Sequence, residues 1–130
     1  MINCLMVGLG GFAGAVMRYL MISIPLPRMD FPFMTLLVNI LGSLLIGIVI
    51  AISAKSGIMG NNMMLFLKVG LCGGFTTFSS FALETHDLIV DGNIVAIAAY
   101  IILSVSLCVI AVLIGGLLVD GAGALIALKD

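Results

Sequence analysis

The sequence predicts an all-α integral membrane protein with four membrane-spanning helices in a single domain, residues 1–130. Of its 130 residues 63% are hydrophobic and only 8% are charged, whereas soluble domains carry about 25% charged residues. Four apolar segments reach the roughly 20 residues that a helix needs to cross a bilayer. Turn-forming residues separate these segments. We therefore expect most of the surface of this chain to face lipid.

The four expected spans follow one another closely. They cover residues 2–24, 33–54, 63–90 and 94–119. All three prolines lie in the first separator, 25–32, while the second, 55–62, is rich in glycine and asparagine, and the third is Asp91-Gly92-Asn93. An even number of spans places both chain ends on the same side. The tail from Asp120 onward is too short to cross again, and we expect it to be an interfacial or loose end.

Composition also excludes several functional classes. The net charge is −1 and there is no run of basic residues, which argues against a nucleic-acid partner. Cys4, Cys72 and Cys108 lie far apart in apolar surroundings, so they fit neither a metal-binding spacing nor a disulfide framework. Because no set of nucleophile and base or cluster of metal ligands is recognisable, an enzyme is disfavoured.

The basic residues specify the orientation of the chain only weakly. The terminal side would carry Lys55, Lys68 and Lys129, and the opposite side Arg18 and Arg28. Three against two is almost no bias under the positive-inside rule. Either other signals fix the topology, or the chain inserts both ways, which would let two copies pair antiparallel. Glycines at helix-contact spacing, including Gly10 and Gly14, favour a homo-oligomer.

Polar residues recur along one face of the second span. Thr35, Asn39, Ser43 and Gly47 follow one another every four residues, which places them on one side of a helix. Polar groups at membrane depth face the interior of the bundle or a wet path, because lipid cannot satisfy them. Asn39 either joins two helices or donates hydrogen bonds to an ion.

The fourth and first spans raise similar alternatives. Tyr100, Ser104 and Cys108 also recur every four residues. They form either a row of weak donors for a small anion or a set in which the hydroxyl bonds back to its own helix. Arg18, near the end of the first span, either extends to the interface or concentrates anions at a pore mouth, and Lys68 in the third span permits the same two interpretations.

Titratable residues gather toward the end of the third span. Glu84, His86, Asp87 and Asp91 lie there, and we interpret them as a solvated helix end and not as a proton-coupled pair. No helix carries a central carboxylate with apolar flanks on both sides. This absence argues against proton antiport.

The third span also predicts a break in its own helix near residues 73–77. Gly73 and Gly74 each lower helix stability by roughly 1 kcal/mol relative to alanine, and Phe-Thr-Thr-Phe follows them. Broken helices present carbonyl oxygens to cations in transporter folds. The carbonyls near Gly73 and Thr76 are therefore candidates for a hard cation such as Na⁺. One chain offers too few oxygens for a full shell, and two copies would double them.

Two aromatic residues follow the break. Phe78 and Phe81 are three residues apart and share a helix face. They are either ordinary packing residues or a contact for an anion, because the edge of an aromatic ring is positive. Such a contact is weak enough to release the ion again, as conduction requires.

Three motifs, each in its own span, carry a family resemblance. They are Gly-Gly-Phe-Ala-Gly-Ala-Val-Met-Arg-Tyr at 10–19, Thr-Leu-Leu-Val-Asn-Ile-Leu-Gly-Ser at 35–43 and Gly-Gly-Phe-Thr-Thr-Phe-Ser-Ser-Phe at 73–81, followed by Glu84. With these motifs the chain resembles the Fluc (CrcB) family of bacterial fluoride channels along nearly its whole length.

The resemblance implies an antiparallel homodimer with two pores in the bacterial cytoplasmic (inner) membrane. It implies passive efflux of F⁻ that relieves fluoride toxicity, and a structural Na⁺ at the dimer centre, held by the carbonyls of Gly73 and Thr76. The fluoride pathway that it implies comprises Asn39, Phe78, Phe81, Ser79, Ser80, Tyr100, Ser104 and Arg18. The sequence departs from the family pattern at Ser80, where threonine is usual, and at Cys108, where a third hydroxyl is expected.

Two rival classes are weighed against this one. Small multidrug exporters also have four spans and dual topology, but they depend on a glutamate in the first helix, and this first span has no acidic residue. A structural or assembly subunit without transport activity would leave the broken third helix and the Asn39 face without a purpose.

Overall fold

The chain folds into a bundle of long apolar helices. A computed structural model describes residues 1–25, 31–57 and 59–127, with the side chains of 122–127 left aside. In this part of the chain the helices long and apolar enough to cross a membrane are Ile2–Ile22, Phe33–Ser56, Asn61–Val90 and Ile94–Gly121. The expected all-α membrane class is therefore confirmed. Arg28 and Lys129, both used in the orientation argument, lie outside the described residues.

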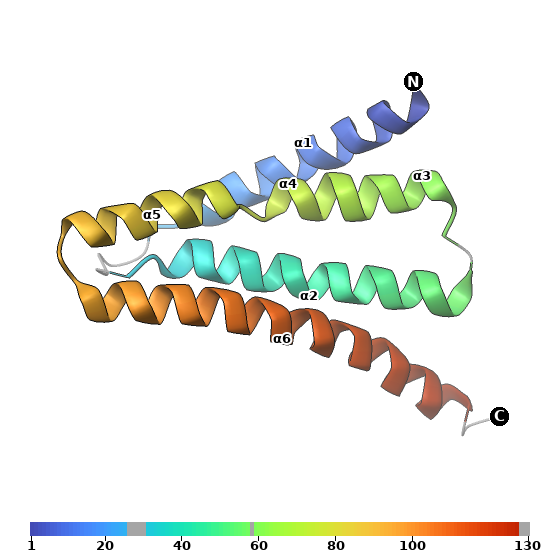
Figure 1. The fold of residues 1–130 in the computed structure, drawn as a ribbon. Helices are drawn as coiled ribbons and strands as arrows, with labels where there is room; N and C mark the ends of the chain where they lie inside the picture. The colour runs from blue at the N-terminus through green and yellow to red at the C-terminus, as the bar shows by residue number, and fades with distance from the viewer. Residues whose placement is uncertain (26–30, 58, 128–130) are drawn as a thin grey trace.

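The helical segments have the following bounds. They are α1 (Ile2–Ile22), α2 (Phe33–Ser56), α3 (Asn61–Met64), the π-helical segment η1 (Leu65–Cys72), α4 (Gly73–Phe75), α5 (Phe78–Val90) and α6 (Ile94–Ala127). Gly57 ends α2 with φ +60° and Gly92 turns the chain between α5 and α6 with φ +70°, a conformation that glycine adopts without steric cost. The start of α1 and the end of α6 lie at the same end of the bundle (Figure 1).

Two helix pairs form the bundle, and glycines bring their backbones together. A Cβ atom added to Gly10 would lie 2.3 Å from the carbonyl oxygen of Phe66, and one added to Gly14 would lie 2.2 Å from that of Leu71. These glycines pack α1 against η1 and α4 of the same chain, so their spacing does not require a second copy. Gly47 makes the equivalent contact in the other pair, α2 with α6, where its Cβ would lie 2.3 Å from the carbonyl oxygen of Val112.

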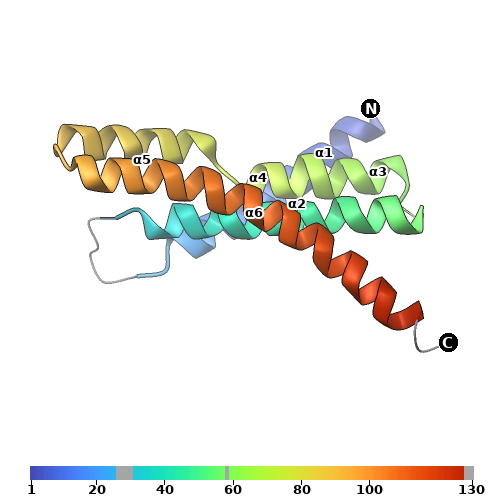
Figure 2. The same cartoon turned by 60° about the horizontal axis from the view of Figure 1, so that its bottom comes forward.

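The last helix is longer than the sequence indicated. We expected a span to residue 119 and an interfacial or loose tail, whereas α6 continues as a helix to Ala127. At 1.5 Å per residue its 34 residues extend over about 51 Å, more than the roughly 30 Å of a hydrocarbon core. Its C-terminal turns diverge from α2 in both views (Figures 1 and 2).

The segment between α4 and α5 is the irregular part of the third span. Thr76 (φ −76°, ψ 157°) and Thr77 (φ −147°, ψ 112°) are extended, and the link that they form is visible between α4 and α5 in Figure 2. Gly73 and Gly74, where we expected unwinding, are helical. Gly74 is packed against the backbone of Gly11, which compensates for its low helix propensity, whereas β-branched threonines suit extended backbone.

Candidate functional site

A cavity of about 350 Å³ lies beside the extended residues. Three parts of the fold contribute to its wall: α2, the segment around the α4–α5 link, and α6. The lining residues are Asn39, Ser43, Thr76, Thr77, Phe78, Phe81, Ser104, Val105, Cys108 and Val109. A largely apolar wall with a few polar groups is the usual composition of a site for a small ligand.

Asn39 fixes the extended backbone and has its own amide fixed in return. Its Oδ1 accepts a hydrogen bond from the backbone N–H of Thr77 at 2.8 Å, and its Nδ2 donates to the carbonyl oxygen of Thr77 at 3.1 Å. An asparagine amide has two N–H donors, so one remains for an occupant of the cavity. The two interpretations of Asn39 are thus compatible, because one side chain joins two segments and still offers a donor.

Thr77 caps the start of α5. Its Oγ1 accepts from the backbone N–H of Ser80 at 3.1 Å and lies 3.0 Å from the hydroxyl of Ser80 and 3.2 Å from that of Ser79. This is the hydrogen bond that an N-cap threonine makes, and it leaves the positive end of the α5 dipole beside the cavity. Ser79 and Ser80 are not lining residues of the cavity; their hydroxyls belong to the cap.

The aromatic residues form a chain of tilted rings. The ring centroids of Phe78 and Phe81 are 5.4 Å apart at 47°, and those of Phe81 and Tyr100 are 5.1 Å apart at 50°. Phe81 is half-buried, whereas Phe78 is 78% exposed. The two phenylalanines that the sequence singled out are therefore in contact and both line the cavity, but most of the surface of Phe78 is exposed.

Ser104 carries an unused hydroxyl into the cavity wall. The residue is 6% exposed, and its Oγ has no hydrogen-bond partner among the residues that the structure describes. A buried hydroxyl without a partner costs free energy, so the Ser104 hydroxyl is available to bond to a group that enters the cavity. Cys108 lies one turn further along α6 and also lines the cavity, between the apolar side chains of Val105 and Val109.

Tyr100, the remaining member of that row, belongs to a different cluster. Its hydroxyl donates to Glu84 Oε2 at 2.5 Å, and the hydroxyl of Thr35 donates to Glu84 Oε1 at 2.6 Å. We expected Glu84 to belong to a solvated helix end. This expectation is wrong, because Glu84 is half-buried and is bonded to residues of α2 and α6. Hydrogen bonds to a carboxylate are stronger than neutral ones, which compensates for its partial burial.

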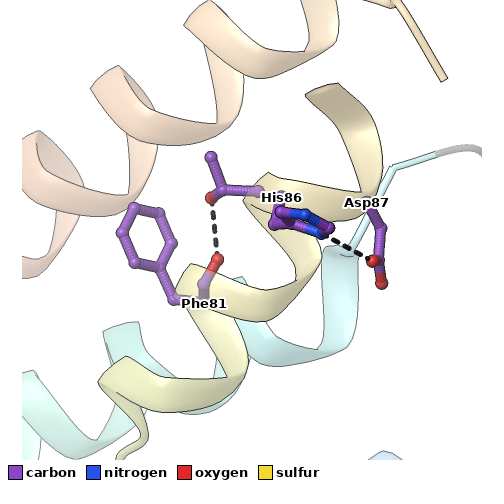
Figure 3. A network of polar contacts seen from close by, with 4 residues as sticks. Phe81, His86 and Asp87 are labelled. Carbon is purple, nitrogen blue, oxygen red and sulfur yellow. Dashed lines mark hydrogen bonds and ion pairs between the residues drawn. The ribbon is translucent and has the colours of Figure 1, made fainter. Parts of the chain in front are cut away.

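The other three titratable residues at this end of the third span are exposed, as expected for a solvated helix end. His86 and Asp87 are both exposed, with His86 Nδ1 3.4 Å from Asp87 Oδ1, and Asp91 is also exposed. The pair points away from the neighbouring Phe81 in Figure 3. Neither residue lines the cavity.

Arg18 reaches the extended segment from the other side. Its Nη1 donates to the carbonyl oxygen of Thr76 at 3.0 Å, and Arg18 is not one of the residues that line the cavity. Lys68 is exposed. The carbonyl that Arg18 contacts is one of the two that the resemblance assigns to Na⁺, and carbonyl oxygens are the ligand type that hard cations prefer. No group of three His, Cys, Asp or Glu side chains that could hold a metal occurs among the described residues.

Sequence reasoning missed the partnership of Thr35, Glu84 and Tyr100. Thr35 was recognised as a polar residue on the Asn39 face, and Tyr100 as part of a row on α6. The sequence did offer one signal. Thr35 precedes Asn39 by one helical turn and Tyr100 precedes Ser104 by one turn, so each row begins with a hydroxyl just before a residue that lines the cavity. Nothing in the sequence paired these hydroxyls with Glu84, because Glu84 is 49 positions from Thr35 and 16 positions from Tyr100 in the chain.

Together, the four apolar spans and the partly polar cavity beside an interrupted helix define a membrane protein of the channel or transporter class. The chain belongs to the CrcB family: the family model described as "CrcB-like protein, Camphor Resistance (CrcB)" matches residues 5–116. The resemblance stated from the three motifs is thereby confirmed.

Relatives with the name "Fluoride-specific ion channel FluC" are similar over most of their length. One from Clostridium perfringens is 44% identical over 113 residues, which cover 85% of this chain and 88% of the relative. One from Methylobacterium radiotolerans is 41% identical over 117 residues, or 87% and 81% of the two chains. A third, from Ruminiclostridium cellulolyticum, is 42% identical over 120 residues, or 91% and 92%.

Proposed function

We propose that this protein is a fluoride-specific ion channel that allows passive efflux of F⁻ across the bacterial cytoplasmic membrane and so relieves fluoride toxicity. Family membership and the names of the relatives, which are channels and not enzymes, support this class. The single structural observation that carries it is the buried hydroxyl of Ser104, which has no partner among the described residues and lies in the wall of a cavity that Asn39 also lines.

The wall offers what a weakly held anion needs. The free N–H of Asn39, the hydroxyl of Ser104, the N-terminus of α5 and the ring edges of Phe78 and Phe81 are donors or positive edges without a full charge. Among the residues that the structure describes, neither arginine nor lysine lines the cavity. Binding can therefore be strong enough for entry and weak enough for exit, which is the condition for conduction.

Passive efflux follows from the chemistry of the ion. In an acidic environment fluoride is protonated to neutral HF, which crosses the membrane. It then ionises inside the cell, where the pH is higher. An inside-negative potential then drives F⁻ outward with about 2.3 kcal/mol per charge per 100 mV. No energy-coupling site is needed for this direction.

An antiparallel homodimer would complete the site. Phe78 exposes most of its ring, and a second copy placed against it would bury an apolar surface beside the cavity and close its open side. The near balance of lysine and arginine between the two sides is compatible with insertion in both orientations. Reporter fusions at the C-terminus test this: two orientations in one membrane support the pairing, and a single orientation contradicts it.

A structural Na⁺ at the dimer centre fits the same segment. The run from Asn61 to Phe75 ends at the extended residues, so the last carbonyls of the run lack helical partners. Those of Gly73 and Thr76 would hold the ion, together with the same pair from the second copy. The bound cation would supply an electrostatic link between two helix ends that otherwise repel.

The function is tested by efflux from liposomes that contain the purified protein. A fluoride electrode and a parallel chloride assay record the loss of each anion. Fast fluoride loss with negligible chloride loss is the expected result. No fluoride loss from a well-folded preparation would contradict the channel, and equal loss of both anions would contradict its specificity.

A further inference from the structure

Arg18 lies on the same face of α1 as the glycines that pack against η1 and α4. Gly10, Gly14 and Arg18 are spaced four residues apart and so share one side of the helix. Because Gly10 and Gly14 are in backbone contact with η1 and α4, the position of Arg18 relative to that helical run is fixed by packing. Its guanidinium is thereby placed on the carbonyl of Thr76, at 3.0 Å.

This carbonyl lies at the negative end of a helix dipole. The helical run from Asn61 to Phe75 ends there, and a helix C-terminus carries about half a negative charge that attracts cations. Among the residues that the structure describes, no carboxylate forms an ion pair with Arg18. The Thr76 carbonyl, at the negative end of this dipole, is therefore the contact that the structure gives for the permanent charge of the guanidinium.

We propose that Arg18 and a cation at the dimer centre are alternative occupants of the Thr76 carbonyl, so that Arg18 sets the Na⁺ concentration at which two copies associate. This inference rests on the proposed function, because it takes the cation and the dimer from there. In the single chain Arg18 neutralises the helix end. When a second copy brings its own carbonyls, Na⁺ displaces the guanidinium.

The physical reason is charge repulsion. A cation at an oxygen–metal distance of about 2.4 Å would lie within roughly 5 Å of the guanidinium nitrogen on the same oxygen. Two positive charges at that separation repel each other substantially even at an effective dielectric constant of about 20. Full occupancy of the carbonyl by both is therefore unfavourable.

A purely structural role makes the opposite prediction. If Arg18 only caps the helix end and fixes the extended segment, its removal would loosen the carbonyls that hold Na⁺. The Na⁺ requirement would then rise or stay unchanged. Under competition, removal of the charge lowers the Na⁺ requirement.

The experiment measures association of the full-length chain as a function of Na⁺. Protomers labelled with donor or acceptor dyes are mixed in detergent, and energy transfer is recorded while Na⁺ replaces choline at constant ionic strength, since screening would otherwise change with the titration. Arg18→Gln keeps a hydrogen-bond donor but removes the charge. Lys55→Gln is the matched control: it removes one positive charge far from the site, where Lys55 Nζ donates to the carbonyl of Val119.

We expect Arg18→Gln to lower the midpoint Na⁺ concentration by about fivefold or more, Arg18→Lys to stay close to wild type, and Lys55→Gln to leave the midpoint unchanged. An unchanged or higher midpoint in Arg18→Gln would overturn the proposal. So would a wild-type protein whose association does not respond to Na⁺. Fluoride efflux by the wild type, measured separately, decides the channel function. A conducting channel whose association does not respond to Na⁺ therefore overturns this inference, and the structural Na⁺ with it, but leaves the channel function standing.

A second route covers the case in which Arg18→Gln does not fold. Arg18→Cys is treated after purification with a cationic or a neutral methanethiosulfonate of similar size. The treated wild type controls for reaction at the exposed Cys4. The cationic adduct should require more Na⁺ than the neutral one, and equal midpoints would again overturn the proposal.

Discussion

The side-chain amide of Asn39 pairs with the backbone of Thr77 through both its oxygen and its nitrogen, at 2.8 and 3.1 Å. This is the pattern that two strands form, made here by one side chain on α2. It holds the chain extended between α4 and α5. It also fixes the orientation of the amide. The oxygen accepts from the Thr77 N–H, so the group left for the cavity is the second N–H of the Asn39 nitrogen.

Asn39→Asp should abolish fluoride conduction and destabilise the fold by about 1–3 kcal/mol. One carboxylate oxygen can still accept the Thr77 N–H, but the other would face the Thr77 carbonyl, and the added negative charge would repel the anion. Liposome efflux and denaturant titration measure the two effects. Asn62→Asp, at an exposed position of α3, is the control for the added charge. Normal efflux from Asn39→Asp would remove this residue from the pathway.

Phe81→Ile should reduce fluoride flux about tenfold or more while the oligomer remains intact. The ring of Phe81 touches those of Phe78 and Tyr100, so its loss removes the positive ring edge at the centre of the aromatic chain. Phe33→Ile, at an exposed position at the start of α2, should conduct like wild type. The measurement is efflux together with size-exclusion chromatography, and wild-type flux in Phe81→Ile would refute the aromatic contact.

Ser104→Ala separates function from stability. Because the Ser104 hydroxyl has no partner among the described residues, its removal should leave the free energy of unfolding unchanged or raise it by up to about 1 kcal/mol. Fluoride efflux should nevertheless fall severalfold if the hydroxyl donates to the ion. Ser106→Ala, exposed on the same helix, should change neither quantity. A clear loss of stability in Ser104→Ala would mean that the hydroxyl bonds within the protein.

Gly14→Ala should destabilise the protein by about 3 kcal/mol or more. Its Cβ would lie 2.2 Å from the carbonyl oxygen of Leu71, a backbone atom that cannot move aside without shifting the helix. Gly8→Ala, on the same helix with no atom within 4 Å of its Cβ, should stabilise by up to about 1 kcal/mol through helix propensity. Thermal unfolding followed by circular dichroism compares the two. Equal melting temperatures would contradict the close contact of α1 with η1.

Particular residues show how far sequence reasoning reached into the site. The four-residue repeats placed Asn39 and Ser43 on one face of the second span, and Ser104 and Cys108 on one face of the fourth, because residues four apart share a helix face. The structure brings these two faces to the same cavity. The same repeat included Tyr100, which does not line the cavity, and the cluster at the end of the third span indicated a solvated Glu84, which is half-buried. A repeat shows which residues share a helix face, but it does not show which residue of another helix lies opposite each of them. The pairing of Glu84 with Thr35 and Tyr100 could therefore not be predicted.

The sequence by itself determined that the chain is an all-α membrane protein of the CrcB family. Hydropathy requires about 20 apolar residues per span, and the three motifs are contiguous in the chain. Only the tertiary structure decided that Thr76 and Thr77 are extended while Gly73 and Gly74 stay helical, and that Arg18 contacts the Thr76 carbonyl. The physical reason is that local propensities differ by roughly 1 kcal/mol, less than the combined contacts that α1 and α2 make with this segment.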